Sequence, residues 1–197
     1  MICAAVLHDT LEDTDTSYEE LCEKFGKRTA DIVQELTSSD AEIETSGKSL
    51  LAAYRDNPGS MEESCLDLAK KLESILQGKQ HRSDPQALER QMRKRLGKSC
   101  YLAKKVSQEL TDDALLCKLS DRLDNVSDMQ DDLARDPNST FPAEYSLETS
   151  FILSRLERSE RGGRLSDGPK SVVEQIKAKI RPFLCPDIKG SEGMVKL

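Results

Sequence analysis

Apolar residues recur at helical spacing along nearly the whole of this 197-residue chain, and this pattern constrains the fold more than any other feature. One clear example is the run of Leu115, Leu119, Leu123 and Val126. Intervals of three and four residues place such side chains on one face of an α-helix. No segment shows the strict alternation of a half-buried strand. The sequence therefore predicts an all-α protein.

Local signals predict where some helices begin and end. Thr16, followed three residues later by Glu19, predicts a capping box, and Gly26 predicts the end of that helix. From Thr37 to Gly47 the apolar pattern gives way to Ser, Thr, Asp and Glu, which predicts a loop.

The chain length corresponds to one domain, since domains hold ~100–200 residues. We interpret residues 1–183 as this domain and residues 184–197 as a disordered tail. A helical pattern between polar stretches at about 40–85 is interpreted as a long inserted segment, partly helical and partly disordered.

Composition excludes several classes of protein. No run approaches the ~20 apolar residues of a membrane-spanning helix. The start of the chain lacks the basic region of a signal peptide, so we expect a cytoplasmic protein. A net charge of −7 repels phosphate backbones, which argues against nucleic acid as a partner.

Six cysteines stand at positions 3, 22, 65, 100, 117 and 185, and no C-x-x-C pair occurs. A zinc cluster or a disulfide framework would need closer spacings. Most of these cysteines lie within apolar helical patterns, where a reduced thiol packs as a small hydrophobic group. We therefore expect reduced, structural cysteines.

The first segment with unusual polar residues is His8-Asp9-Thr10-Leu11-Glu12-Asp13. On one helix, His8 and Glu12 would share a face, and Asp9 and Asp13 would share the adjacent face. These groups repel one another at neutral pH unless a cation is present. With a cation, His and Asp become ligands, and the other acids can transfer protons. The alternative is an exposed helix end with scattered acidic residues.

The second segment contains Asp121 and Asn125, four residues apart on one helix face. Leucines flank Asp121 at two positions on either side, so its carboxylate is expected to be partly buried and to need a cation or several donors. The alternative is a surface carboxylate paired with Lys118 or Arg122.

Together the two segments resemble the HD domain of RelA/SpoT-type alarmone hydrolases. The resemblance rests on Ile2–Asp15 with its His-Asp pair, on Phe25-Gly26 and Ile32–Thr37, and on Lys118–Asn125. It covers residues 1–37 and about 93–130 well.

The resemblance implies an HD-domain helical bundle that acts as a manganese-dependent hydrolase. Its members remove pyrophosphate from the 3′ position of guanosine tetra- or pentaphosphate, the nucleotides of the stringent response. It implies that the metal ligands are His8, Asp9 and Asp121. It assigns proton transfer at the attacking water to Glu12 and Asp13, and contact with the nucleotide to Asn125 and Tyr145.

The sequence departs from the family pattern at its start, because the first metal-ligand histidine of the family lies upstream of the His-Asp pair. We therefore expect an N-terminally truncated chain. Its other histidine, His81, has polar flanks and is expected in a solvated loop. The alternative is a catalytically silent module for nucleotide binding or for interaction, and the N-terminal apolar residues make a second copy of the chain a candidate partner.

Overall fold

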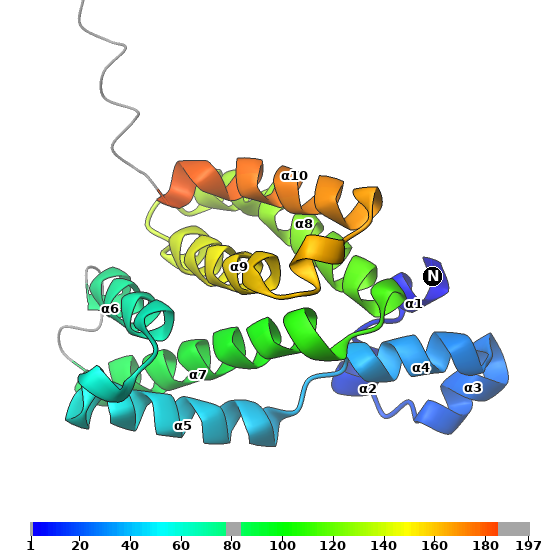
Figure 1. Cartoon of the computed structure of the whole chain (residues 1–197), viewed down its shortest axis with the longest axis horizontal. Coiled ribbons are helices and arrows are strands. Elements are labelled where there is room, and N and C mark those ends of the chain that lie inside the picture. The colour runs from blue at the N-terminus through cyan, green and yellow to red at the C-terminus, as the bar shows by residue number, and fades with distance from the viewer. Residues whose placement is uncertain (1, 78–83, 185–197) are drawn as a thin grey trace, which may run out of the picture.

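A computed structural model describes residues 2–77 and 84–184, and within these ranges it contains helices and no strand (Figure 1). The α-helices are α1 (Ile2–Val6), α2 (Thr10–Asp13), α3 (Tyr18–Phe25), α4 (Lys27–Leu36), α5 (Asp40–Asp56), α6 (Glu63–Gln77), α7 (Pro85–Lys104), α8 (Asp112–Arg135), α9 (Phe141–Arg158) and α10 (Asp167–Leu184). The all-α prediction is confirmed. Leu184, the first residue of the expected tail, ends α10, and the rest of the tail lies outside the described residues. His81 also lies outside them.

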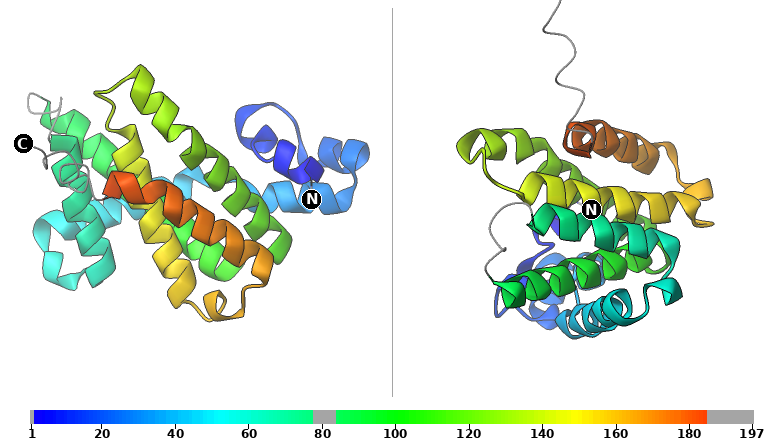
Figure 2. Two further views of the ribbon diagram at one scale, coloured as in Figure 1. Left: turned by 90° about the horizontal axis from the view of Figure 1, so that it is seen from above. Right: turned by 90° about the vertical axis from the view of Figure 1, so that its left-hand side faces the viewer.

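The helices form a layered bundle. The short helices α1 to α4 lie together at one end, beside the first part of α8 (Figures 1 and 2). The long helices α5 and α7 lie side by side, and α6 packs on α7 and α9. Helix α9 contacts α6, α7, α8 and α10 and is buried along most of its length. Polar side chains on α9 therefore need partners within the fold.

Helix α3 begins one residue later than the sequence signal indicates. Ser17 is the N-cap, its hydroxyl accepts a hydrogen bond from the Glu20 amide, and the Glu20 carboxylate accepts one from the Ser17 amide. The predicted capping box is thus present, with its register shifted from Thr16 and Glu19. The predicted end of this helix at Gly26 is confirmed, and the φ of this residue is 82°. A positive φ of this kind favours glycine, which has no Cβ atom.

The loop predicted from Thr37 to Gly47 is wrong beyond residue 39, because α5 begins at Asp40. The Ser39 hydroxyl accepts a hydrogen bond from the Glu42 amide and caps the helix. Serine, threonine and aspartate are typical of loops, but here they form the cap and the exposed side of a helix.

Two glycines bring α5 and α7 into close contact. A Cβ atom at Gly47 would lie 2.3 Å from the Arg93 carbonyl oxygen, and one at Gly97 would lie 2.2 Å from that of Ile43. No side chain fits at either distance, so the crossing depends on both glycines. The segment predicted as an insertion forms α5 and α6, with a short 3₁₀ turn at Pro58–Ser60 between them. Its status as an insertion stays a prediction.

None of the helices in the described ranges combines the length and apolar character needed to cross a membrane.

Candidate functional site

His8 lies in the turn between α1 and α2. Helix α1 ends at Val6 and α2 begins at Thr10, so the single helix assumed for the first polar segment is interrupted. The His8 Nδ1 atom lies 2.8 Å from the Ala5 carbonyl oxygen. Because a carbonyl oxygen only accepts hydrogen bonds, Nδ1 carries the proton and Nε2 points the other way.

The structure brings three predicted ligands together at His8 Nε2. This atom lies 2.9 Å from Asp9 Oδ2 and 3.5 Å from Asp121 Oδ1. Asp9 is the N-cap residue of α2, but its side chain makes no capping hydrogen bond and is directed to the imidazole instead. Asp121 comes from α8, which runs beside α1 (Figure 2). The His8 and Asp121 side chains are 24% and 21% exposed.

Asp121 also contacts two neighbours on its own helix. Its Oδ2 atom lies 3.3 Å from Lys118 Nζ, and its Oδ1 atom accepts a hydrogen bond of 2.9 Å from Asn125 Nδ2. The predicted ion pair with Lys118 is therefore present. The predicted pair with Arg122 is not found, because that side chain points into the bundle. Asn125 orients the Asp121 carboxylate toward His8.

Two carboxylates meet at His8 Nε2, and little positive charge lies between them. A ring with its proton on Nδ1 alone would direct the Nε2 lone pair at both carboxylate oxygens, and that arrangement would be repulsive. A proton on Nε2 or a bound cation would relieve the repulsion. Lys118 supplies one positive charge at the far oxygen of Asp121 and none between His8 and Asp9.

Glu12 and Asp13 lie on α2 and are exposed. The Glu12 carboxylate accepts a hydrogen bond from the Ser38 amide, in the connection between α4 and α5. The described part of the chain shows no ion pair from His8 to either acid. The interruption of the helix at His8 explains this, since the four-residue spacing no longer places both side chains on one face.

Tyr145 lies beside the cluster on α9, under Arg122. Its ring centroid is 4.8 Å from the Arg122 guanidinium carbon and 5.4 Å from the Phe141 ring centroid, in a stacked arrangement. Burial raises the pKa of the Tyr145 hydroxyl; Arg122 lowers it, and the Asp121 carboxylate adds to the rise. Arg122 also donates a 2.6 Å hydrogen bond to Thr149.

A network of buried charges that the sequence did not reveal lies next to these residues. Arg95 on α7 contacts Glu144 at 2.9 Å and Glu148 at 2.7 Å, both on α9, and these two side chains are 5% and 2% exposed. Burial raises the pKa of Glu148, and Arg95 and Arg122 act against that rise. The signal that could have revealed the network is two glutamates four residues apart on an otherwise apolar face of a helix.

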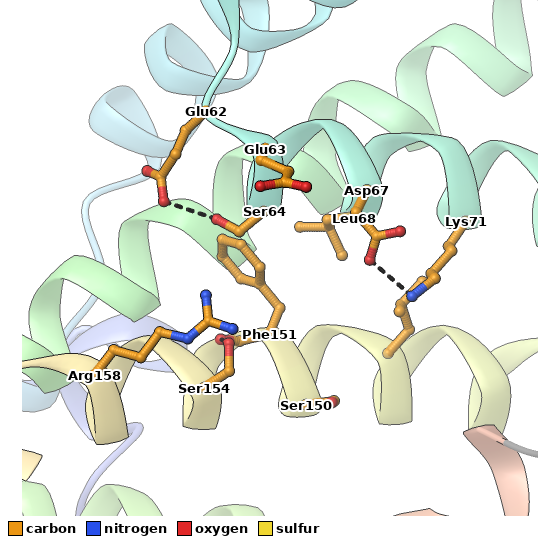
Figure 3. Close-up of a pocket in the computed structure, with 11 residues that line it drawn as sticks. Glu62, Glu63, Ser64, Asp67, Leu68, Lys71, Ser150, Phe151, Ser154 and Arg158 are labelled. Carbon is orange, nitrogen blue, oxygen red and sulfur yellow. Dashed lines mark hydrogen bonds and ion pairs between the residues drawn. The ribbon is translucent and has the colours of Figure 1, made fainter.

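Two of the concave sites in the described part of the bundle lie away from His8. A pocket of about 500 Å³ lies between α6 and α9, and its lining residues include none of the predicted site residues (Figure 3). A pocket of about 870 Å³ is bordered by Lys94, Arg95 and Lys98 of α7 and by Phe141 and Glu144 of α9. This second pocket lies against the buried network and not against His8.

The side chains at His8 can be tested as ligands for a metal ion by their chemistry and by their arrangement. Imidazole nitrogen and carboxylate oxygen are suitable ligands for a transition-metal ion such as Mn²⁺. The Nδ1 hydrogen bond to Ala5 is the kind of support that orients a ligating histidine. In the ranges that the structure describes, however, no group of three or more His, Cys, Asp or Glu side chains is arranged to hold a metal ion. The ligand atoms are therefore of a kind that suits Mn²⁺, but they are not arranged as a preformed metal site.

Comparisons with known proteins find short, strong similarities. No family model and no solved structure matches the chain. Over 36 residues, 18% of this chain, it is 64% identical to guanosine-3′,5′-bis(diphosphate) 3′-pyrophosphohydrolase of Aquifex aeolicus (strain VF5). Over 37 residues, 19% of the chain, it is 60% identical to guanosine-3′,5′-bis(diphosphate) 3′-pyrophosphohydrolase MESH1 of Danio rerio.

These similarities cover 5% of the first relative and 21% of the second, so the chain matches a small part of each. Identity of 60% or more over such a stretch shows that this part of the chain is similar to a part of two pyrophosphohydrolases.

Proposed function

We propose that this chain is a phosphohydrolase that removes pyrophosphate from the 3′ position of guanosine 3′,5′-bis(diphosphate) or a related nucleotide. The observation that carries the proposal is the meeting of His8, Asp9 and Asp121 at one nitrogen atom. The printed names of both relatives, which state this activity for those proteins, support the substrate class.

The proposal includes a divalent cation, Mn²⁺, held by His8, Asp9 and Asp121. When bound, such a cation makes its water acidic and offsets the charge of the phosphate under attack. The imidazole contributes Nε2 because Ala5 holds the Nδ1 proton. Asn125 fixes the orientation of the Asp121 carboxylate.

The remaining residues act on the water and on the substrate. Glu12 and Asp13 are exposed carboxylates one turn after His8, and we assign them to accepting the proton of the attacking water. Lys118, at the outer oxygen of Asp121, is placed to attract the substrate phosphates. Asn125 and Tyr145 are assigned to the nucleoside.

The experiment is to measure pyrophosphate release from guanosine tetraphosphate with Mn²⁺ present. We expect release by the wild-type chain and its loss in Asp121→Ala and Glu12→Ala. Asp121→Ala should also remove the rise in melting temperature that Mn²⁺ produces, whereas Glu12→Ala should keep most of it. Asp124→Ala, which changes an exposed carboxylate one turn along α8, is the matched control and should behave as wild type.

Full activity of Asp121→Ala, or no release by folded wild-type chain, would overturn the proposal. Equal loss of the Mn²⁺ effect in both alanine variants would overturn the division of roles between Asp121 and Glu12.

A second candidate function is a nucleotide-binding or interaction module without catalysis. Two observations favour it. The described residues contain no preformed metal group. Ile2 and Val6 on α1, which leads into the His8 turn, are 83% and 77% exposed. Exposed apolar side chains of this size are typical of an interaction surface. Binding of guanosine tetraphosphate without pyrophosphate release would support this candidate over the hydrolase.

A further inference from the structure

Two cysteines from different helices lie in direct contact. Cys65 Sγ on α6 is 3.8 Å from Cys100 Sγ on α7, and both side chains are partly buried against the core. The five cysteines in the described residues are all free. Cys3, Cys22 and Cys117 lie on three other helices, and no second contact between sulfur atoms occurs among the five. This contact sets the pair apart from the other three cysteines in the described ranges.

The surroundings of the two sulfur atoms differ. Cys65 follows Ser64, which lines the pocket between α6 and α9 (Figure 3). Arg155 of α9 forms an ion pair with Glu62, just before α6. The hydrogen bond with Cys100 lowers the pKa of the Cys65 thiol to about 7, although burial and the Glu62 charge oppose this, while Arg155 assists.

The pKa of the second thiol, Cys100, is shifted in the opposite direction. The same contact raises the pKa of the Cys100 thiol, and burial adds to the rise. The thiolate is the reactive form of cysteine. Because Cys65 follows a residue that lines the pocket between α6 and α9, whereas Cys100 lies on α7, we assign Cys65 as the nucleophile and Cys100 as the resolving partner.

We propose that Cys65 and Cys100 are a redox pair that forms a reversible disulfide between α6 and α7 in the presence of a hydroperoxide. The two sulfur atoms are 3.8 Å apart. A disulfide bond has an S–S length of ~2.0 Å, so the two sulfur atoms must approach each other by ~1.8 Å for the bond to form. The proposal is independent of the proposed hydrolase function.

The reaction balances with hydrogen peroxide as the oxidant. The Cys65 thiolate attacks one peroxide oxygen, the O–O bond breaks, and the leaving hydroxide takes up a proton as water. The resulting Cys65 sulfenic acid is attacked by the Cys100 sulfur. The S–S bond forms, and the sulfenic hydroxyl leaves as a second water with the Cys100 proton. Two thiols are oxidised by two electrons, and one peroxide becomes two waters. A dithiol reductant reverses the disulfide by exchange.

The experiment treats the folded chain with hydrogen peroxide, blocks free thiols, and maps the peptides by mass spectrometry without reduction. We expect the linked pair Cys65–Cys100 as the main disulfide, and its disappearance after dithiothreitol. In Cys100→Ser we expect a sulfenic acid at Cys65, trapped by dimedone, and no disulfide at this position. In Cys65→Ser we expect Cys100 to remain reduced.

Cys22→Ser is the matched control, because Cys22 is also partly buried on a helix and has no sulfur neighbour among the described residues. It should leave the yield of the linked pair unchanged. Circular dichroism establishes that each variant is folded before oxidation. Sulfinic acid at Cys65 with a free Cys100, or linked peptides distributed over several cysteine pairs, would overturn the proposal.

Discussion

Two clusters of charged side chains lie in different parts of the bundle, and they are built in opposite ways. In the buried cluster, Arg95 is held between Glu144 and Glu148 at 2.9 and 2.7 Å, with little exposure of either carboxylate. In the partly exposed cluster, His8 meets the carboxylates of Asp9 and Asp121, and the described residues place no arginine between them. In the first cluster the cation lies between two buried carboxylates, while in the second the cation, Lys118, lies at the far oxygen of Asp121 and not between His8 and Asp9.

The comparison separates a structural role from a binding role. A buried charge without its partner is strongly destabilising, so the buried cluster is expected to control stability. An ion pair that water reaches contributes little to stability, so the partly exposed cluster is expected to control the response to cations. Perturbing each cluster in turn tests this separation.

The largest effect on stability is expected for Arg95→Met. The change leaves the carboxylates of Glu144 and Glu148 buried without their cation. The loss of such a partner costs about 3–5 kcal/mol, and urea unfolding measures it. Lys94→Met, at an exposed position of the same helix, is the control. It should change stability by about 0.5 kcal/mol at most, as surface substitutions do. Similar values for both variants would show that the buried cluster has no special role.

Tyr145 lies between the two clusters, and two substitutions separate its functions. Tyr145→Ala removes the ring that contacts Arg122 and Phe141. This loss of packing should cost about 2–4 kcal/mol. Tyr145→Phe keeps the ring and should leave the melting temperature close to that of wild type. If the hydroxyl contacts the nucleotide, Tyr145→Phe raises KM for guanosine tetraphosphate. An unchanged KM would remove Tyr145 from the substrate site.

A smaller, pH-dependent effect is expected for Glu148. Its pKa is raised in the folded state above the usual 4.5, so the folded state binds the proton more tightly than the unfolded state. The stability that Glu148 contributes is therefore present in full below the unfolded-state pKa and falls as the pH rises through the folded-state pKa. The stability advantage of wild type over Glu148→Gln should shrink from pH 4.5 to pH 8 in urea unfolding. An advantage that grows with pH would contradict the raised pKa.

The smallest effect on stability is expected at the partly exposed cluster. Asp121→Asn removes the charge that faces His8 and Lys118. It should change the free energy of unfolding by less than about 1 kcal/mol, because water screens these contacts. Calorimetric melting without added metal measures it. A loss as large as that of Arg95→Met would make Asp121 a structural residue.

Helical periodicity was sufficient to predict the fold class, because apolar spacing records which face of each helix is buried. It did not predict α5 correctly, since close contact with α7 requires small residues that also occur in loops. Gly47 and Gly97 have this ambiguity, and their roles depend on helices that are far apart in sequence.

The parts of the candidate site that local sequence patterns encode were predictable, and the parts that depend on packing between helices were not. The neighbouring residues His8 and Asp9 are recognisable as a local motif, and Asp121 was found through its flanking leucines. The turn that separates His8 from Glu12 was not predicted, because helical spacing was assumed across it. The buried partners of Arg95 depend on the packing of α7 on α9, which no local spacing encodes.

The central claim, that His8, Asp9 and Asp121 bind a divalent cation, is tested most directly by titrating the folded chain with Mn²⁺ in a calorimeter. The account predicts saturable binding of one Mn²⁺ per chain, which is lost in Asp121→Asn and kept in Asp124→Asn. Binding that is absent from the wild type, or equally strong in Asp121→Asn, would contradict it.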